Sequence, residues 1–208
     1  MRIELLHIPA DPEKLIESVG RTARPYFESM KEATQPSVMK IVNSIHISVI
    51  EHVYATFRIS DVSRAFSNQL IRHRIATYTQ VGLRYIDEHG FAFIVPPQIQ
   101  ENPNTLKVFN EAMASCNEYY NRLLKLGISK EEARYVLPHA CTTQIVMTAN
   151  LREYRHVFQE HGGINAPWEL RLMCIEMLKV LKEKCPTVFE DMVIDEFKGQ
   201  KIIRMKTG

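Results

Sequence analysis

The residues with the clearest chemical potential lie in one short stretch of the chain. Arg72, His73 and Arg74 are adjacent, and Arg84 follows after a mostly uncharged run. Each guanidinium presents a planar fork of N–H donors that matches phosphate oxygens, so the stretch is suited to an anionic ligand. The alternative interpretation is a solvated basic helix end, because cations near a helix C-terminus interact favourably with the macrodipole and need no ligand.

A helix is expected to position these residues. Apolar residues recur at helical spacing between Val62 and Leu70, and Ser60 or Asp61 is expected to cap the helix start. Three polar residues at i, i+3 and i+4 would then share one face of this helix: Gln69, Arg72 and His73. After Arg74 the pattern changes, and residues 77–80 are predicted to be extended.

The remaining chain alternates between the two kinds of secondary structure. Strands are predicted at 1–8, 53–59, 84–86, 91–95 and 201–204. Helices are predicted at 13–33, 38–45, 103–126, 129–137, 150–158 and from 167 to 181, with Asn102 and Ser129 as N-terminal caps. Helices dominate and no linker interrupts the chain, which predicts a single α+β domain over residues 1–208.

Composition limits the classes of function. The chain has 208 residues with 45% hydrophobic and 24% charged residues, which is ordinary for a soluble protein. The formal net charge of +2 gives no general nucleic-acid signature, so any anion site must be local. No apolar run is long enough to span a membrane. We therefore expect neither nucleic acid nor a membrane as a partner.

The cysteines and histidines do not form a metal motif. None of Cys116, Cys141, Cys174 and Cys185 belongs to a C-x-x-C pair, which argues against zinc and against a redox motif. Scattered cysteines without a signal peptide predict a reducing cytoplasm. The segment from His46 to His52 lacks the His-Glu-x-x-His spacing of a metal site, so hydrogen bonding or ligand contact is the favoured interpretation.

Five blocks of polar and charged residues follow one another along the chain. They are His46-x-Ser48-x-x-Glu51-His52, Arg72-His73-Arg74 with Arg84-Tyr85, Ala133-Arg134-x-Val-Leu-Pro138, Asn150-x-Arg152-x-x-x-His156-x-Phe158, and Ala166-x-Trp168-Glu169-Leu170-Arg171. In this order they resemble the blocks of the flavin-dependent thymidylate synthase family, whose hallmark is Arg-His-Arg followed at fixed spacing by Arg-Tyr. A lone Arg-His-Arg would be weak evidence for the family. The ordered set of five blocks is strong evidence, because it covers roughly residues 40 to 180.

The resemblance implies an activity and a set of ligands. It implies methylation of dUMP at carbon 5, with FAD as cofactor and NADPH and methylenetetrahydrofolate as co-substrates. It also implies a mixed or antiparallel sheet core with long flanking helices, and a homotetramer. The residues implied to hold FAD are Ser48, Arg72, His73, Arg74, Gln80, Asn150, Arg152 and His156. The residues implied to hold the pyrimidine nucleotide are Gln69, Arg72, Gln80, Val81, Gly82, Leu83, Arg84, Arg134 and His161, with Arg84 and His161 as catalytic candidates.

Three departures from the family pattern fall in or beside the blocks that touch the pyrimidine. Gly82 stands in place of a serine, His161 in place of the arginine that holds the uracil base, and Pro167 in place of a glutamine. Histidine is shorter than arginine and titrates near neutrality. The alternatives are therefore an enzyme acting on another pyrimidine nucleotide such as UMP, a hydroxymethylase, or a flavin- or nucleotide-binding homologue without catalysis. Arg155 is a possible substitute for the missing guanidinium.

Overall fold

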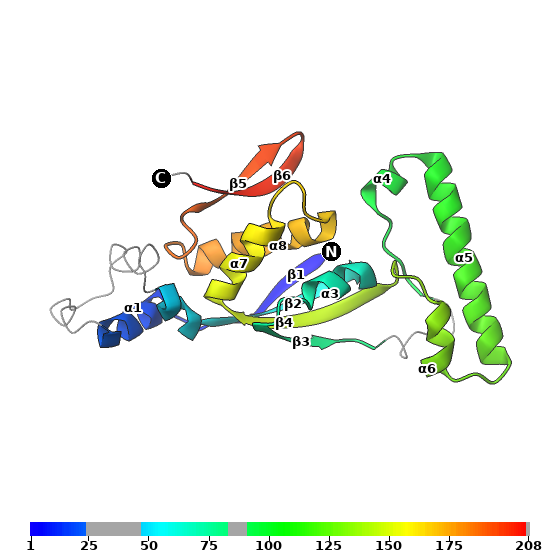
Figure 1. Cartoon of the computed structure of the whole chain (residues 1–208), viewed down its shortest axis with the longest axis horizontal. Coiled ribbons are helices and arrows are strands. Elements are labelled where there is room, and N and C mark those ends of the chain that lie inside the picture. Colours follow the sequence, from blue (N-terminus) through cyan, green and yellow to red (C-terminus); the bar gives the residue numbers. More distant parts are fainter. Residues whose placement is uncertain (24–46, 83–90, 207–208) are drawn as a thin grey trace. The chain divides into compact units, whose positions relative to one another are not determined.

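A computed structural model of the chain describes residues 1–23, 47–82 and 91–206. Its central element is a four-stranded sheet of order β1-β2-β4-β3 (Figure 1). The strands are β1 (Arg2–His7), β2 (Tyr54–Ser63), β3 (Ala76–Gln80) and β4 (Thr142–Asn150). A separate antiparallel hairpin is formed by β5 (Met192–Phe197) and β6 (Gln200–Met205), with Met192 opposite Met205.

Helices of different lengths connect these strands. They are α1 (Pro12–Ala23), the 3-10 helix η2 (Ile47–His52), α3 (Arg64–Leu70), α4 (Pro97–Gln100), α5 (Pro103–Lys125), α6 (Lys130–Ala133), the 3-10 turn η4 (Arg134–Val136), α7 (Leu151–His161) and α8 (Trp168–Lys184). The mixture of helices and sheets confirms the predicted α+β class.

Alternation of side chains explains why the two central strands form. Ala55, Phe57 and Ile59 are buried on β2, and Ile145 and Met147 are buried on β4. Because successive side chains point to opposite faces of a strand, this pattern gives the sheet a well-packed apolar face.

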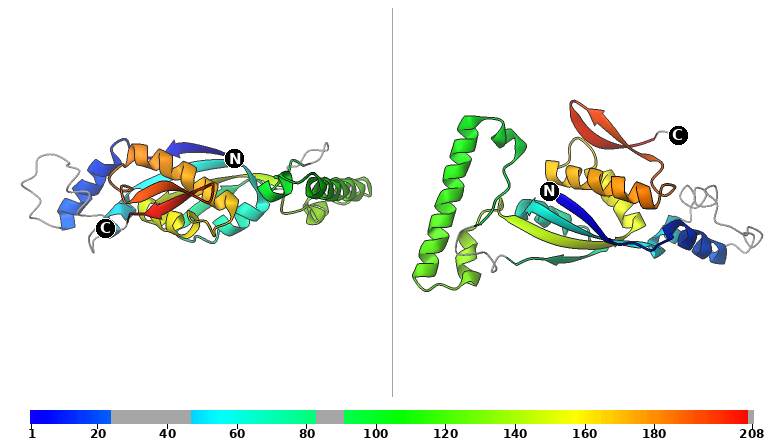
Figure 2. Two further views of the ribbon diagram at one scale, coloured as in Figure 1. Left: turned by 90° about the horizontal axis from the view of Figure 1, so that it is seen from above. Right: turned by 180° about the vertical axis from the view of Figure 1, so that it is seen from behind.

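Helices α7 and α8 form a layer over one face of the sheet, and the β5–β6 hairpin lies on their outer side (Figures 1 and 2). Helix α8 is covered by neighbours around most of its circumference, so Met173, Cys174 and Met177 are all buried. The ring of Phe158 on α7 lies 5.8 Å from that of Phe189 in the segment that leads to the hairpin. These contacts fix α7, which carries many of the predicted site residues.

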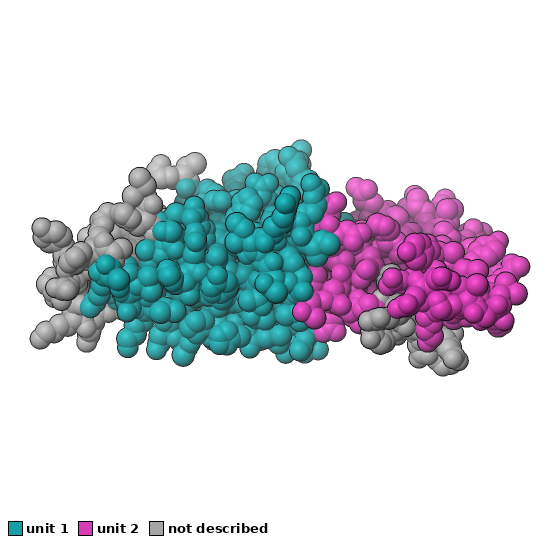
Figure 3. Space-filling model, turned by 60° about the horizontal axis from the view of Figure 1, so that its bottom comes forward, with its two compact units in different colours: residues 1–59, 70–78, 146–208 teal, residues 60–69, 79–145 magenta. Residues whose placement is uncertain are grey.

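The chain divides into two compact units, shown in Figure 3. Unit 1 consists of residues 1–59, 70–78 and 146–208, and unit 2 consists of residues 60–69 and 79–145. Unit 1 is assembled from three segments of the chain and unit 2 from two. The assignment of the whole chain to one domain stays a prediction.

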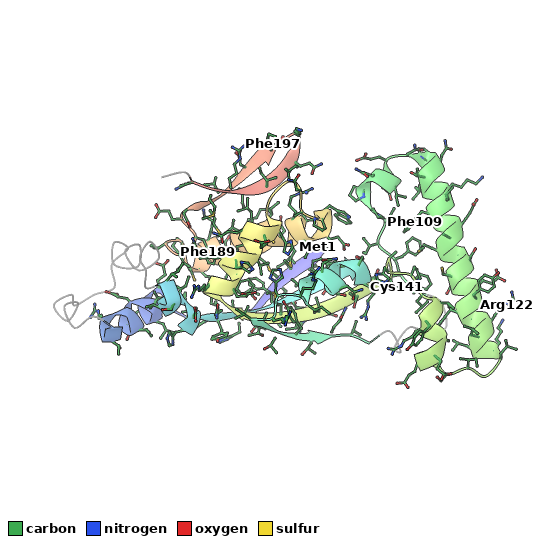
Figure 4. All side chains as sticks on the ribbon, in the orientation of Figure 1. Met1, Phe109, Arg122, Cys141, Phe189 and Phe197 are labelled. Atoms are coloured by element: carbon green, nitrogen blue, oxygen red, sulfur yellow. The ribbon has the colours of Figure 1, made fainter. Side chains whose placement is uncertain are left out.

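Helix α5 dominates unit 2 and begins and ends as its sequence indicates. The side chain of Asn102 accepts a hydrogen bond from the Asn104 backbone N–H at 2.9 Å. At the other end Gly127 has φ +87°, a left-handed conformation in which a Cβ is strained. On the inner face the ring of Phe109, labelled in Figure 4, lies 5.7 Å from that of Phe93.

Three local predictions need correction. The cap of α3 is neither Ser60 nor Asp61, because β2 continues to Ser63, whose Oγ accepts from the Phe66 N–H at 3.0 Å. The C-terminal segment forms two paired strands where only 201–204 was expected. Of the expected strand at 91–95, only Phe93 forms a bridge, to Cys141. The predicted helix at 38–45 and the predicted strand at 84–86 lie outside the described residues.

The described ranges offer neither a membrane-spanning helix nor a metal-ligand cluster. Within residues 1–23, 47–82 and 91–206, no helix has the length and apolar character needed to cross a lipid bilayer. The same residues contain no group of three or more histidine, cysteine or carboxylate side chains placed to hold a metal ion.

Candidate functional site

The Arg-His-Arg stretch forms a turn that follows helix α3. The helix ends at Leu70, so Arg72 and His73 do not share a helical face with Gln69 as predicted. The backbone N–H of His73 donates to the Leu70 carbonyl at 3.2 Å. The hydroxyl of Tyr78 on β3 donates to the carbonyls of Leu70 and His73, at 2.9 and 3.1 Å. The turn is thereby tied to the neighbouring strand.

This turn separates the three basic side chains. His73 points inward with a side chain only 10% exposed, whereas Arg72 and Arg74 are exposed. Among the residues that the structure describes, no carboxylate pairs with either guanidinium. The stretch therefore presents two solvent-facing cations beside one half-buried imidazole, and the anion site stays a prediction.

Helix α7 supplies a second group of predicted residues. Asn150 caps its start by accepting from the Glu153 N–H at 2.8 Å. Arg152 and His156 are four residues apart and therefore share a face of the helix. A guanidinium nitrogen of Arg152 is paired with the carboxylate of Glu51 on η2.

A cavity of about 530 Å³ opens beside this face of α7, within unit 1. The residues that line it come from η2, the turn and α7: Ile47, Glu51, Ile75, Asn150, Arg152, Glu153, Arg155, His156 and Gln159. Three predicted flavin residues, Asn150, Arg152 and His156, are thus brought together. The other predicted flavin residues do not line the cavity. They are Arg72, His73, Arg74, Gln80 and Ser48, the last of which lies on η2 between two residues that do.

Two histidines from distant parts of the chain are in direct contact. His73 Nε2 lies 2.8 Å from His161 Nε2, with the ring centroids 5.0 Å apart. On the opposite side of the His73 ring, Nδ1 lies 3.5 Å from Glu153 Oε1. The His156 ring centroid is 5.6 Å from that of His73. A predicted flavin residue and a predicted pyrimidine residue therefore contact each other.

Burial and neighbouring histidines keep this pair uncharged at neutral pH. Burial lowers the pKa of His73, with a further decrease from His156, while Glu160 acts in the opposite direction. Burial and His73 likewise lower the pKa of His161. The 3.5 Å approach of Glu153 favours a proton on His73, but desolvation is the larger effect. His161 consequently lacks the permanent charge that an arginine would place there.

The other predicted nucleotide residues belong to unit 2 or lie outside the described residues. In unit 2, Gln80 Nε2 donates to Thr143 Oγ1 at 3.1 Å, and the Val81 N–H donates to the Gln144 carbonyl at 3.1 Å. Arg134 Nε donates to the Glu131 carbonyl at 3.0 Å. Gln69 is exposed on α3 and Gly82 follows β3, whereas Leu83 and Arg84 are outside the described ranges.

Two side chains near the cavity were not predicted to have their observed roles. Glu153 is only 6% exposed beside His73, although its spacing from Asn150 indicates nothing more than a helix start. Arg155 is buried and pairs with both carboxylate oxygens of Asp191, and it also donates to the Val188 carbonyl. Arg155 is therefore engaged in the packing of α7 and does not replace the missing guanidinium.

All four cysteines are free, and three of them are buried. Burial raises the pKa of Cys141 to about 11 and that of Cys185 to about 12, and it also raises the pKa of Cys174. A buried thiol that stays protonated is a poor nucleophile. The thiols thus have the properties of packed apolar side chains.

We expect each cysteine to be dispensable for turnover. Replacing Cys116, Cys141, Cys174 or Cys185 singly with alanine or serine should leave measurable activity, because no thiol takes part in the chemistry. Steady-state assays of the four variants, with circular dichroism to verify folding, test this expectation. Complete loss of activity in one properly folded variant would contradict it.

Comparison with known proteins places the chain in a family. The family model described as "Thymidylate synthase complementing protein" matches residues 4–187. The flavin-dependent thymidylate synthase of Geobacter sulfurreducens is 38% identical over 200 residues, which cover 92% of this chain and 86% of that protein. The corresponding protein of Clostridium tetani is 33% identical, with 91% of this chain and 86% of that protein covered.

The fold is also that of a solved structure. The flavin-dependent thymidylate synthase ThyX from Helicobacter pylori, complexed with FAD and dUMP, aligns with a TM-score of 0.75 at 22% identity. The alignment covers 92% of this chain and 99% of that one. The match of the family model over most of the sequence, together with relatives of this similarity, shows that the chain belongs to the thymidylate synthase complementing protein family, whose members include the flavin-dependent thymidylate synthases.

Proposed function

We propose that this protein is a flavin-dependent enzyme that methylates dUMP at carbon 5 to give dTMP, with methylenetetrahydrofolate and NADPH as co-substrates. The observation that carries the proposal is the cavity in unit 1. Asn150, Arg152 and His156 line it together, although the family resemblance alone assigned them to one ligand. A relative with this activity in its name is 38% identical to the chain, with 92% of the chain covered.

The donor set at the cavity fits FAD. A dinucleotide with a diphosphate requires N–H donors and cations near an apolar surface, and the cavity combines Arg152 and His156 with the apolar side chains of Ile47 and Ile75. Its volume of about 530 Å³ is in the range of ligand sites. FAD, when bound, supplies the reducing equivalents of the reaction.

Each group of residues has a proposed role in binding. Arg72 and Arg74 neutralise the diphosphate, and His73 and His156 flank the flavin site. Asn150 orders the start of α7, and Glu51 holds the guanidinium of Arg152 in place. Ser48 and Gln80 are proposed to complete the FAD site.

The pyrimidine nucleotide is assigned to a second group of residues. Arginine is suited to its phosphate because the guanidinium binds two oxygens at once. The proposed contacts are Gln69, Arg72, Gln80, Val81, Gly82, Leu83, Arg84, Arg134 and His161. Arg84 and His161 are proposed to act on the reacting base, where the charged donor Arg84 would stabilise developing negative charge.

Product analysis tests this function directly. The purified protein is incubated with FAD, NADPH and methylenetetrahydrofolate and with either dUMP or UMP, and the nucleotides are identified by mass spectrometry. We expect dTMP from dUMP, and no product when FAD is left out. A methylated product from UMP alone would show that the enzyme acts on UMP. A hydroxymethylated nucleotide would show that it is a hydroxymethylase. Absence of any product with both nucleotides, despite bound FAD, would indicate a non-catalytic homologue.

The protein is further proposed to act in the reducing cytoplasm as a homotetramer. The four free cysteines agree with a reducing compartment. Large apolar side chains are exposed in unit 2, including Val108 at 66%, Leu126 at 79% and Tyr135 at 85%. We propose that these side chains contribute to the contacts between copies of the chain.

We expect light scattering to give the mass of a tetramer of the 24.1 kDa chain. Replacing Leu126 and Tyr135 with serine should shift the mass distribution toward smaller species, because less apolar area is buried on association. The matched control is Lys125→Ser, an exposed polar neighbour on α5. A monomer that still binds FAD with full occupancy would refute the oligomer.

A further inference from the structure

A carboxylate and two imidazoles form a continuous chain of polar contacts inside unit 1. Glu153 Oε1 approaches His73 Nδ1 at 3.5 Å, and His73 Nε2 approaches His161 Nε2 at 2.8 Å. The side chains of His73 and Glu153 are 10% and 6% exposed. Both side chains are largely shielded from solvent, so their contacts within the protein bear strongly on where the protons lie.

The protons in such a chain are not independent of one another. A neutral imidazole carries one N–H group and one unprotonated nitrogen, and an ionised carboxylate only accepts. Glu153 therefore favours the proton of His73 on Nδ1. The Nε2 atom of His73 is then an acceptor, so the 2.8 Å contact requires that His161 donates through its own Nε2–H. The remaining nitrogen of His161, Nδ1, is left without a proton.

We propose that Glu153 is a positioning residue that acts through His73 to hold His161 in the Nε2–H tautomer, with Nδ1 as a hydrogen-bond acceptor. The choice of ligand rests on the proposed function: the uracil ring of a pyrimidine nucleotide carries one imide N–H, a donor that suits this acceptor. An arginine at position 161, expected from the family resemblance, would only donate. The histidine thus reverses the hydrogen-bond polarity offered to the base.

Hydrogen bonds fix the backbone at His73 and next to His161. The His73 N–H and carbonyl are bonded to Leu70 and to the Tyr78 hydroxyl. Next to His161, the Gly162 carbonyl accepts from the Ile203 N–H of β6 at 2.8 Å. A Cβ at position 162 would lie 2.6 Å from the Cβ of Ile203, so glycine permits this close approach. The imidazole pair is therefore preorganised.

Burial, more than the surrounding charges, maintains the neutral pair that the tautomers require, because it is the largest cause of the lowered pKa of both histidines. On α7, Glu153 contacts His73, while His156 lowers and Glu160 raises the pKa of both His73 and His161. From β3, the Tyr78 hydroxyl bonds to the His73 carbonyl and remains protonated, because burial raises its pKa. One added proton fits on His161 Nδ1 without breaking the chain. A second would bring two N–H groups face to face.

Nuclear magnetic resonance of the ligand-free protein tests the proposal. Long-range proton–nitrogen correlation spectra of protein with nitrogen-15-labelled histidine assign the protonated nitrogen of each ring, above the pKa of both histidines. We expect His73 with its proton on Nδ1 and His161 with its proton on Nε2. Observation of His73 protonated on Nε2 would overturn the proposal without any variant.

A pair of variants on α7 separates positioning from a general effect of charge. Glu153→Met keeps the side-chain length but removes both acceptor oxygens, and we expect His73 and His161 to populate their other tautomers. Glu160→Gln removes a carboxylate that acts on the same two histidines and is exposed; we expect it to shift their titrations downward with unchanged tautomers. Unchanged tautomers in a folded Glu153→Met protein would contradict the positioning role.

The same samples distinguish this inference from the proposed function. Calorimetry with dUMP over a range of pH reports nucleotide binding, whereas the tautomers are read without nucleotide. If His73 and His161 carry their protons where we expect them but dUMP does not bind, the proposed function fails and the positioning role stands. If dUMP binds but the protons lie on other nitrogens, only the positioning role fails.

Discussion

The double substitution Arg72→Ala and Arg74→Ala is expected to weaken FAD binding by about a hundredfold to ten-thousandfold. A hydrogen bond to a charged group contributes about 1.5–3 kcal/mol, and each substitution removes one charged donor from the proposed diphosphate site. Both guanidiniums are exposed and, among the described residues, unpaired with a carboxylate, so their loss leaves no uncompensated charge. The stability of the fold should change little.

Flavin absorbance after purification and calorimetric titration with FAD measure this effect. The control is Arg122→Ala, because Arg122 is also an exposed arginine whose guanidinium is 3.7 Å from Glu118 on α5, away from the predicted site in sequence. The pair Arg72→Lys and Arg74→Lys keeps the charge but loses the planar fork, and it should give an intermediate affinity. Full flavin occupancy in the double alanine variant would show that these arginines do not hold FAD.

The double substitution His161→Arg and Gly82→Ser is expected to strengthen dUMP binding about tenfold to hundredfold. The physical reason is charge. Burial and His73 lower the pKa of His161, so the native residue is neutral at neutral pH, whereas a guanidinium remains charged. Serine at position 82 adds a hydroxyl beside the proposed nucleotide residues. Together these changes supply about one charge-assisted contact.

Calorimetry with dUMP and UMP on four proteins tests this expectation: the native chain, the two single variants and the double variant. FAD occupancy is measured in parallel and should be the same in all four, since the Arg-His-Arg turn is unchanged. If the native protein already binds dUMP as tightly as the double variant and excludes UMP, then Gly82 and His161 have not altered the pyrimidine site. The idea of an altered substrate would then fail, and ordinary synthesis of dTMP from dUMP would stand.

The elements that the sequence predicted best are those whose signals are local. Asn102 and Ser129 cap their helices as expected, because a side chain that accepts from a backbone N–H two or three residues ahead needs no distant partner. The residues of α8 that helical spacing predicted to be buried, among them Leu170, Cys174 and Leu181, are buried, although the covered surface is wider than that stripe. The five ordered blocks likewise sufficed to indicate the family, since motif order is a property of the chain alone.

The end of α3 could not be predicted in this way. Helical spacing continues from Gln69 to His73, yet the helix ends at Leu70. The carbonyls of Leu70 and His73 instead accept from the hydroxyl of Tyr78, a residue of strand β3. A hydrogen bond from a neighbouring strand thus stabilises the turn, and local propensity is too weak a preference to override such tertiary contacts.

The residues of the site show the same difference between what local sequence predicts and what only tertiary contacts decide. The sequence by itself determined the family, the α+β class and which residues of α7 share a face, because these depend on residue types and their spacing. Only the tertiary structure decided that Arg155 is committed to Asp191, that Glu153 faces His73, and that His73 meets His161 across 88 positions of sequence. The last contact joins a residue assigned to FAD with one assigned to the nucleotide. It exists because the turn after α3 and the end of α7 are brought together by the packing of unit 1, and no local pattern in the chain encodes that proximity.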